Sequence, residues 1–333
     1  MFKVFMRRGV LSPFSTGCWK GWATVKIFVT GGTGFVGRNI VERLVKEGHE
    51  VTITSSGIGP HYPGVKKILY RGFEGIDWKY LRGQDAVVHQ FANNDTRCQD
   101  ESEMFRANVD GPIKMFTAAV EGGCKKFVYA SSTAVYGAQP APYVENTTLV
   151  KPLNVYGQSK AKFDEFAMKF AQDHQVLVTG FRYCNVYGPG ETHKEKRMSM
   201  IGQLLRQMLA GKRPAIFKDG EQKRDWIYVQ DVVQANMLAL ARKAEEPFGR
   251  IYNLGSGVAT TFNEIIRTIN DVLREKLGRS PLATEYIDCS FASEYQSFTQ
   301  CGMDKAKKEL GLTIQYDLRA GIAAYLRDLT GAA

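Results

Sequence analysis

The 333-residue sequence is poor in cysteine and contains no long apolar run. Its six cysteines form no CxxC pair and no His/Cys cluster with zinc spacing, so we expect reduced thiols, no metal site and a cytoplasmic location. No apolar segment approaches the ~20 residues that a helix needs to span a bilayer. Charged residues form 23% of the chain and aromatic residues 11%, which excludes a disordered chain, a collagen-like fibre and a small disulfide-stapled scaffold.

Acidic residues are the scarcer charged class, with 34 Asp and Glu against 44 Lys and Arg, and the formal net charge is +10. A basic protein of this kind binds polyanions, either nucleic acids or phosphate-bearing metabolites. The sequence has no Lys- and Arg-rich run of the nucleic-acid-binding type. It therefore favours the metabolite and predicts neither a nucleic-acid nor a membrane partner.

Residues 1–24 contain basic residues but no acidic one. They lack the continuous apolar segment of a secretory signal, while a transit peptide stays open. We favour a mis-assigned start near Val25, where the first strand pattern begins, or a disordered extension. This segment is left out of the fold prediction.

Residues 25–187 alternate short β-branched runs with amphipathic segments. The strand patterns cover residues 25–30, 50–54, 67–70, 85–91, 126–131 and 176–183. The helical patterns cover residues 35–47, 103–121 and 156–172. Strands that alternate with helices predict a Rossmann-like, doubly wound parallel sheet with right-handed crossovers, which belongs to the α/β class.

The pattern changes in residues 188–333, which begin with the glycine-rich break Gly188–Pro189–Gly190. Helices are expected at 198–210, 232–243, 263–276 and 318–329, and strands at 215–217, 226–229 and 250–253. We expect a smaller α/β lobe packed against the carboxyl edge of the sheet. Ligands of open α/β sheets bind at that edge, so this lobe is predicted to close over the substrate.

A glycine turn follows the first strand directly, where TGGTGFVG contains Gly31, Gly34 and Gly37. Glycine allows the backbone to approach a pyrophosphate, and the following helix offers free N–H groups and a positive dipole end. A turn that serves packing alone is the other explanation. In this strand–helix context the motif predicts a dinucleotide-binding site.

The second strand ends in Thr54–Ser55–Ser56 and not in the carboxylate that usually binds the adenosine ribose of NAD. Without that carboxylate, a 2′-phosphate meets no repulsion. The hydroxyl groups of Ser55 and Ser56, with Arg38 in the first turn of the helix, are candidates to receive it. We therefore predict NADP, with NAD as the alternative.

Tyr156 and Lys160 stand four residues apart in NVYGQSK, so both project from one face of a helix. A tyrosine with a pKa near ~10 is a poor base at neutral pH. A neighbouring ammonium group and a positively charged nicotinamide are expected to lower that pKa. The fifth strand ends in a serine-rich turn, ASSTAVYG, from which a serine can hydrogen-bond the substrate hydroxyl.

These motifs, in this order, resemble the extended short-chain dehydrogenase/reductase family of nucleotide-sugar epimerases and dehydratases, over roughly residues 25–330. The resemblance implies a catalytic triad of Ser132, Tyr156 and Lys160. The cofactor-binding residues that it and the motifs imply are Gly31, Gly34, Phe35, Val36, Gly37, Ser55, Ser56, Gln90, Phe91, Ala92, Asn108, Tyr156, Lys160 and Val186. Dehydratases carry Asp–Glu after the catalytic hydroxyl residue, where this chain has Thr133 and Ala134, so dehydration is disfavoured.

Within that family, the segments FRYCNVYGPGETHKEK, RDWIYVQDV and EYQSFTQ resemble the ADP-L-glycero-D-manno-heptose 6-epimerases. The resemblance implies that Lys194 is a second acid/base residue, whereas a solvated loop charge is the alternative. Glu294 departs from the basic residue that often precedes YQ. The implied substrate-binding residues are Ser132, Asn185, Gln203, Phe217, Arg224 and Tyr295.

The predicted function is epimerisation of a nucleotide sugar, with ADP-heptose favoured, through a keto-sugar intermediate and a tightly bound NADP. A UDP-hexose 4-epimerase, or another epimerase or reductase of nucleotide sugars, needs the same triad without Lys194. A non-catalytic dinucleotide-binding sensor is the alternative of another class, but such proteins tend to lose the Tyr or the Lys of the triad. Pairing of long helices predicts a homo-oligomer.

Overall fold

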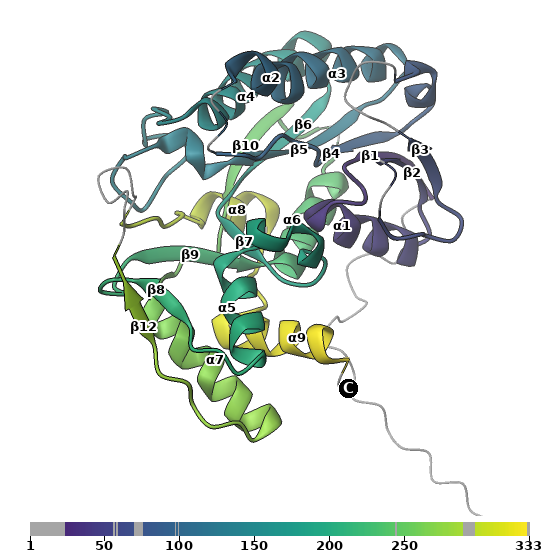
Figure 1. Ribbon diagram of the computed structural model, residues 1–333. Coiled ribbons are helices and arrows are strands. Elements are labelled where there is room, and N and C mark those ends of the chain that lie inside the picture. The colour runs from purple at the N-terminus through teal and green to yellow at the C-terminus, as the bar shows by residue number, and fades with distance from the viewer. Residues whose placement is uncertain are drawn as a thin grey trace, which may run out of the picture.

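The computed structural model describes residues 24–55, 57, 59–69, 76–96, 98, 100–243, 245–288 and 297–331. A seven-stranded sheet, parallel throughout, forms the centre of the molecule (Figure 1). In spatial order its strands are β10 (Gly249–Leu254), β6 (Leu177–Tyr183), β5 (Lys126–Ser132), β4 (Ala86–His89), β1 (Lys26–Thr30), β2 (Glu50–Ser55) and β3 (Lys66–Leu69).

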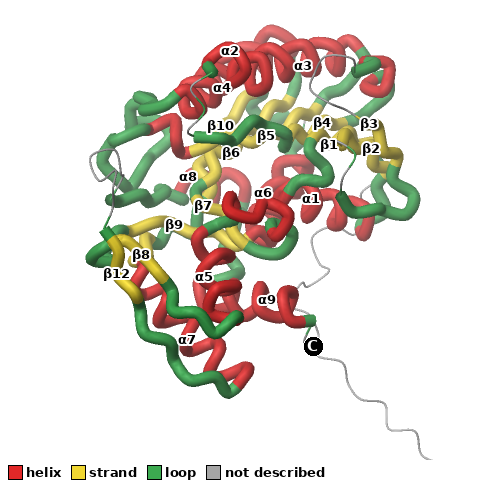
Figure 2. Tube along the Cα trace, in the orientation of Figure 1, coloured by secondary structure: helices red, strands yellow, loops and turns green. Residues whose placement is uncertain are grey.

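Alternating side chains of these strands fill two cores, one on each face of the sheet. Ile27 and Val29 of β1 belong to one core and Phe28 to the other, as the two-residue period of a strand requires. Figure 2 shows helices on both faces of the sheet. On one face lie α1 (Phe35–Lys46), α6 (Val229–Ala241) and α8 (Asp304–Leu310), and on the other α2 (Glu101–Phe105), α3 (Gly111–Glu121) and α4 (Val155–His174).

A smaller lobe with its own apolar core lies beyond the sheet. Its strands are β7 (Asn185–Tyr187), β9 (Lys223–Tyr228) and β11 (Ala259–Thr261), which form one sheet, and β8 (Ala215–Phe217) and β12 (Glu285–Ile287), which pair with each other. Its helices are α5 (Met200–Leu209), α7 (Phe262–Leu277) and α9 (Leu318–Thr330). Among the described residues, no helix is both long and apolar enough to cross a membrane.

The Rossmann-like α/β prediction is confirmed. The helix predicted at 232–243 as part of the lobe lies instead on a face of the large sheet, because α6 packs against α1 and β5. Two further elements differ from the prediction. The strand predicted at 250–253 lies in the large sheet and not in the lobe, because β10 pairs with β6 over its whole length. The helix predicted at 103–121 begins at Glu101 and is interrupted by a π-helical segment, Arg106–Asp110. Neither feature has a local sequence signal, since both depend on packing.

The prediction of reduced thiols is wrong for two cysteines, because Cys184 and Cys301 form a disulfide across 117 residues of sequence. Cys184 follows β6, and Cys301 precedes α8, so the fold and not the spacing brings them together. Cys98 and Cys124 are free. Cys18 and Cys289 lie outside the described residues.

A buried ion pair joins α4 to the sheet. The Asp164 carboxylate accepts from Nε of Arg182 and from the hydroxyl of Tyr129, each at 2.9 Å. Arg182 also donates to the Tyr136 hydroxyl at 2.9 Å, and Tyr136 donates to Asn253 of β10 at 2.7 Å. Because both charges are almost fully covered, the loss of one would leave the other buried without a partner.

We expect Asp164→Ala to lower the free energy of unfolding by about 3–5 kcal/mol, because Arg182 would keep its charge in a buried site. Asp173→Ala removes an exposed ion pair with Lys169 on the same helix and is the matched control. Its effect should stay below about 1 kcal/mol. Urea unfolding followed by circular dichroism measures both, and equal effects would contradict the buried-pair argument.

Candidate active site

The glycine turn after β1 leaves no space for side chains. Gly31 has a φ of +66°, and a Cβ there would lie 2.8 Å from the backbone nitrogen of Phe91. A Cβ on Gly37 would lie 2.1 Å from the carbonyl oxygen of Gly31. Helix α1 starts from Gly34, whose N-cap position has no side-chain hydrogen bond. This backbone cradle at a helix N-terminus fits a pyrophosphate group.

The end of β2 is polar and carries no carboxylate among its described residues. The Ser55 hydroxyl lies 3.2 Å from the Thr33 hydroxyl and accepts from the Gly57 amide at 3.2 Å. The Lys67 ammonium donates to the Gly57 carbonyl at 3.2 Å. Ser56 lies outside the described residues. Lys67, which was not among the predicted residues, therefore lies beside the end of β2. It reaches this place because β3 pairs with β2 in parallel.

Arg38 contacts the loop after β7 and its own helix. Its side chain packs against Gly190, where a Cβ would lie 2.5 Å from the Arg38 Cδ, and its guanidinium group lies 3.6 Å from Glu42. The prediction that Arg38 adjoins Ser55 therefore gains no support from these contacts. Helix geometry explains the pairing, since Arg38 and Glu42 are four residues apart.

The loop after β4 closes the other side of the glycine turn. Gln90 accepts from the Tyr183 hydroxyl and donates to Asn236 of α6, each at 3.2 Å. The Phe91 amide donates to the Thr30 hydroxyl at 3.3 Å. These contacts fix the ends of β1 and β4, with Ala92 next in the loop, where the strand order of the sheet reverses. An open α/β sheet binds its ligand in the crevice at that point.

Asn108 ties this loop to α4 from inside the π-helical segment. Its side chain exchanges two hydrogen bonds of 2.8 Å with the backbone of Asn93 and donates to the Ser159 hydroxyl at 3.0 Å. Ser159 donates in turn to the Tyr156 carbonyl at 2.7 Å. Asn108 thus holds the loop and the helix that carries Tyr156 and Lys160 in one arrangement.

The structure brings the three predicted triad residues together. Ser132 lies near enough to Tyr156 for its hydroxyl to lower the pKa of that phenol, and it also accepts from the Ala134 amide at 3.1 Å. The Lys160 ammonium lies 5.9 Å from the centre of the Tyr156 ring and donates to the Ala130 carbonyl at 2.9 Å. Strand β5 ends and α4 begins at the same edge of the sheet, so both elements deliver their polar groups to one place.

The pKa of Tyr156 moves in the direction opposite to our expectation. Burial raises the pKa of this phenol, and the Ser132 hydroxyl opposes that rise only in part. Burial also lowers the pKa of Lys160 to about 8, while Asp164 one turn later on the same helix acts to raise it. Both shifts favour neutral groups, because a covered site penalises charge.

Lys194 lies over the start of α1 and not in free solvent. Its ammonium is 4.7 Å from the centre of the Phe35 ring, and burial lowers its pKa. The loop that carries it is fixed at both ends: Asn39 of α1 donates to the Pro189 carbonyl at 2.9 Å, and the buried Glu191 accepts from the Ser199 amide at 2.6 Å. This placement argues against a purely solvated loop charge.

The predicted substrate residues of the lobe lie on separate elements. Asn185 and Val186 are in β7, where Asn185 donates to the Asp225 carbonyl at 2.9 Å, and Phe217 is in β8. Gln203 of α5 donates to the Met198 carbonyl at 2.8 Å. Tyr295 lies outside the described residues.

Arg224 is half-buried in β9 and donates to the Lys223 carbonyl at 2.9 Å. Two aspartates that follow it in the sequence accept hydrogen bonds from backbone amides. Asp225 accepts from the amides of Ser256, Gly257 and Cys301 at 2.7–3.1 Å. Asp231 accepts from the amides of Gln315 and Tyr316. This structural use of both acids was not predicted, although their place in an apolar segment indicates burial.

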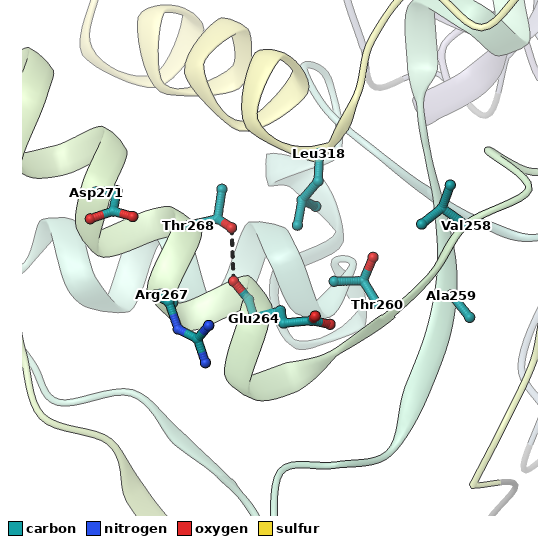
Figure 3. Close-up of a pocket in the computed structure, with 8 residues that line it drawn as sticks. All are labelled: Val258, Ala259, Thr260, Glu264, Arg267, Thr268, Asp271 and Leu318. Carbon is teal, nitrogen blue, oxygen red and sulfur yellow. Dashed lines mark hydrogen bonds between the residues drawn. The ribbon is translucent and has the colours of Figure 1, made fainter.

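A further group of side chains, Cys184, Asp225 and Cys301, places its ligand-type atoms within 4.8 Å of one another. The two sulfur atoms are bonded to each other and so are not thiolate ligands. A separate cavity of about 290 Å³ lies at the start of α7. Figure 3 shows residues that line it, among them Thr260, Glu264, Arg267 and Asp271. It contains none of the predicted site residues.

Comparison with known proteins places this geometry in context. Residues 27–255 match the NAD dependent epimerase/dehydratase family. The chain is 32% identical to the ADP-L-glycero-D-manno-heptose-6-epimerase of Helicobacter pylori, with a TM-score of 0.80 over 92% of this chain and 96% of that one. It is 28% identical to MoeE5, solved with UDP-glucuronic acid and NAD, with a TM-score of 0.80 over 92% of this chain and 100% of the other.

The shift at Lys160 predicts a pH-dependent stability. Below pH 8 the lysine is protonated in both the folded and the unfolded chain, and its burial is then fully unfavourable. Between about 8 and its usual 10.5 only the unfolded chain keeps the proton, so the free energy of unfolding should rise with pH relative to Lys160→Met, by up to about 3 kcal/mol. Urea unfolding at pH 7.5 and pH 10 measures the difference. Lys162→Met, at an exposed neighbour on α4, should follow the wild type at both pH values.

Proposed function

This chain belongs to the NAD dependent epimerase/dehydratase family, and we propose that it epimerises ADP-glycero-manno-heptose at C6, from the D-glycero to the L-glycero form. The family match and the solved epimerases identify an NAD-dependent nucleotide-sugar epimerase. The sugar, the carbon and the choice of NADP are the proposal. The placement of Lys194 over Phe35, at the start of the helix that follows the glycine turn, is the observation that carries it.

An epimerase that inverts one carbon has to move protons on both faces of a flat ketone. The residues give two separate groups for this: Tyr156 beside Ser132 on one side, and Lys194 on the loop over α1. In the proposed reaction, Tyr156 accepts the proton of the C6 hydroxyl and releases it to solvent before the next turnover. Lys194, whose pKa burial lowers, exchanges a proton with the sugar oxygen when the opposite face is presented.

The remaining residues hold the two ligands. The backbone of Gly31, Gly34 and Gly37 would receive the pyrophosphate of the dinucleotide, and Lys160 would bind its nicotinamide ribose and support Tyr156. When bound, the nicotinamide cofactor accepts a hydride and returns it, and its oxidised ring adds a positive charge. Arg224 and Asn185 would contact the substrate diphosphate, for which a planar guanidinium fork is suited.

A UDP-hexose 4-epimerase is the second candidate. The similarity to MoeE5, which was solved with UDP-glucuronic acid, extends over nearly the same part of this chain as the similarity to the heptose epimerase. This reaction uses the same triad and gives Lys194 no role. A non-catalytic sensor is disfavoured, since Ser132, Tyr156 and Lys160 are all present and in contact distance of their partners.

The first test is conversion of ADP-D-glycero-D-manno-heptose by the purified protein, without added cofactor, with the C6 epimer ratio followed by proton NMR. We expect a mixture of the two epimers. Tyr156→Phe and Lys194→Met should each lower kcat by roughly 10²–10⁴-fold, because each removes one proton-transfer group. Thr192→Ala, at an exposed position of the same loop, is the control and should keep full activity.

The outcomes separate the candidate reactions. Full activity of Lys194→Met toward the heptose contradicts the two-base mechanism. No conversion of the heptose, even with NADP or NAD added, together with turnover of a UDP-hexose that is insensitive to Lys194→Met, establishes the 4-epimerase instead.

The choice of NADP is supported by the polar end of β2 and by the ammonium of Lys67 beside it. We expect tighter binding of NADP than of NAD in fluorescence titrations of the cofactor-free protein. Lys67→Ala should weaken NADP binding about 5–10-fold and leave NAD binding unchanged, since only NADP carries the 2′-phosphate. Lys66→Ala on the same strand is the control. Equal or tighter binding of NAD would refute the preference.

A further inference from the structure

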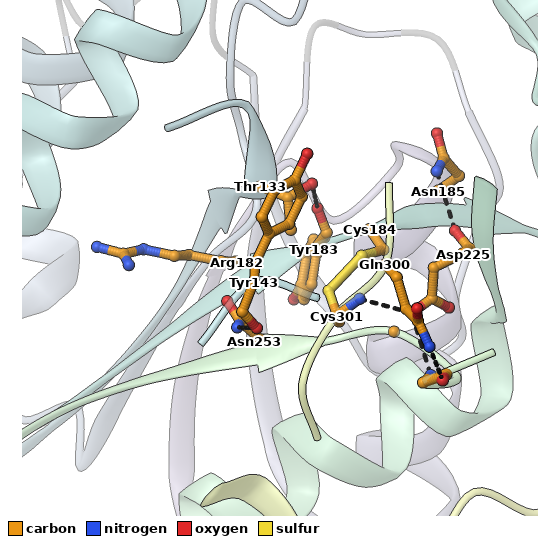
Figure 4. Close-up of a disulfide and its surroundings, with 12 residues drawn as sticks. Thr133, Tyr143, Arg182, Tyr183, Cys184, Asn185, Asp225, Asn253, Gln300 and Cys301 are labelled. Carbon is orange, nitrogen blue, oxygen red and sulfur yellow. Dashed lines mark hydrogen bonds between the residues drawn. A yellow bond between two sulfur atoms is a disulfide. The ribbon is translucent and has the colours of Figure 1, made fainter. Parts of the chain in front are cut away.

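The disulfide lies among the proposed substrate residues. Cys184 stands between Tyr183, which donates to Gln90 of the cofactor loop, and Asn185, a proposed diphosphate contact. Its partner Cys301 donates its amide to the Asp225 carboxylate at 3.0 Å. Figure 4 shows the sulfur bridge beside Tyr183, Asn185 and Asp225. One covalent bond therefore connects the carboxyl end of β6 with the final stretch of the chain.

Residues 297–302, here called the tether segment, are held mainly by backbone hydrogen bonds. The Ser297 carbonyl accepts from Lys223, and the Thr299 amide donates back to the Lys223 carbonyl, at 2.8 and 3.1 Å. At the other end, the Gln300 carbonyl accepts from Tyr143 at 2.8 Å, and Gly302 donates to the Tyr143 carbonyl at 2.7 Å. Lys223 directly precedes Arg224, and Cys184 directly precedes Asn185. The tether segment, which is bound to Lys223 and Cys184, therefore lies next to both proposed diphosphate contacts.

We propose that the Cys184–Cys301 disulfide is a redox-controlled tether of the substrate site: its reduction by a dithiol loosens the tether segment and weakens nucleotide-sugar binding while cofactor binding stays intact. The proposal rests on the function proposed above for the substrate. The described hydrogen bonds of the glycine turn, of Ser132 and of Lys160 run to Thr54, Ala134 and Ala130, so opening the disulfide leaves these contacts of the cofactor half in place.

When the disulfide opens, Asp225 still links β7 to the tether segment. Asp225 is buried and joins both sides, because its carboxylate accepts from Cys301 and its carbonyl accepts from Asn185. Without the disulfide, hydrogen bonds and the packing of the buried Cys301 side chain hold the tether segment, and each hydrogen bond contributes little net free energy in competition with water. The bond also closes a loop of 117 residues, whose opening increases the freedom of the chain.

A dithiol supplies the electrons and protons that reduction of the Cys184–Cys301 disulfide requires. One thiolate of a dithiol attacks a sulfur of the disulfide, and the released cysteine thiolate takes up a proton. The second thiol of the reductant then closes its own disulfide and releases the other cysteine, so that two electrons and two protons pass to the protein.

Access to the sulfur atoms requires an opening of the segment. Cys184 is 8% exposed and Cys301 is 2% exposed, so a reductant reaches them only when residues 297–302 lift away. A ligand that holds the segment closed therefore slows the reduction. By linkage, the same coupling makes the reduced protein bind that ligand more weakly.

The other described cysteines provide controls. The Cys124 thiol donates to two backbone carbonyls, and burial raises its pKa to about 12, so it is a poor nucleophile at neutral pH. Cys98 lies on the loop before α2 and is part-buried. Cys98→Ser therefore changes the thiol content without touching the tether.

The experiment compares the oxidised protein with the protein treated with dithiothreitol. Alkylation and peptide mapping should label Cys184 and Cys301 only after reduction. Hydrogen exchange should then become at least tenfold faster in residues 297–302. KM for the nucleotide sugar, or Kd for ADP and UDP by calorimetry, should rise at least fivefold, with the Kd for NADP changed less than twofold. Addition of ADP or UDP should slow the labelling.

Variants separate the tether from other effects of the reductant. Cys184→Ser and Cys301→Ser should each behave like the reduced wild type and be insensitive to dithiothreitol, whereas Cys98→Ser should keep the full response. Alkylation of both cysteines in the untreated protein, or reduction that leaves hydrogen exchange in 297–302 unchanged, overturns the proposal. So does faster exchange with unchanged nucleotide and nucleotide-sugar affinity.

If the proposed epimerase function is wrong, the experiments give a different result from the one expected if the redox proposal is wrong. In that case no ADP- or UDP-sugar is turned over, while mapping, hydrogen exchange and the affinities for ADP and UDP still decide whether the disulfide controls the lobe.

Discussion

The close approach of two backbones at the ends of β1 and β4 is the constraint on which the site depends. Gly31 lies so near the Phe91 amide that no side chain fits between them. Because all seven strands run in one direction, their carboxyl ends meet at one edge, and the order of the sheet reverses between these two strands. The crevice that results gathers groups from distant parts of the sequence. Ser55, Gln90 and Ser132 reach it because each stands at or just beyond the end of its own strand.

The sequence correctly predicts those features of the structure that depend on the spacing of nearby residues. The strands of the sheet follow from β-branched runs, the glycine turn from its place after the first of them, and the shared face of Tyr156 and Lys160 from their separation of four residues. Pairings between distant segments carry no such local signal. Strand β10 joins the large sheet through β6, and Cys184 meets Cys301 because the fold places the end of β6 beside the segment before α8, where the Cys301 amide donates to Asp225. The use of Asp225 as an acceptor of backbone amides has the same origin.

Buried polar groups connect the two halves of the molecule beneath the site. Asp164 on the helix of Lys160 pairs with Arg182, and Arg182 reaches Tyr136, which donates to Asn253. Asn253 in turn donates to the Tyr143 carbonyl at 2.8 Å, the same carbonyl that accepts from Gly302 beside the disulfide. A continuous set of hydrogen bonds thus runs from the helix that bears the triad to the segment that borders the substrate lobe. Such a network is costly to interrupt, because each member is covered and finds no water to replace a lost partner.

Burial shifts the pKa values of the two triad side chains in opposite directions, and both shifts favour the neutral form of the side chain. It raises the pKa of Tyr156 and lowers that of Lys160, so each is pushed toward its neutral form. At neutral pH the proton therefore stays on the phenol, and Tyr156 alone is a weak base. A positive charge close to the phenol lowers its pKa and so favours the phenolate. In a buried site the same charge lowers the pKa more than it does in water. Burial therefore keeps Tyr156 protonated as long as no ligand is bound. It also makes the activity of Tyr156 as a base depend on a bound cation, which has to lie beside the phenol before the phenol can accept a proton.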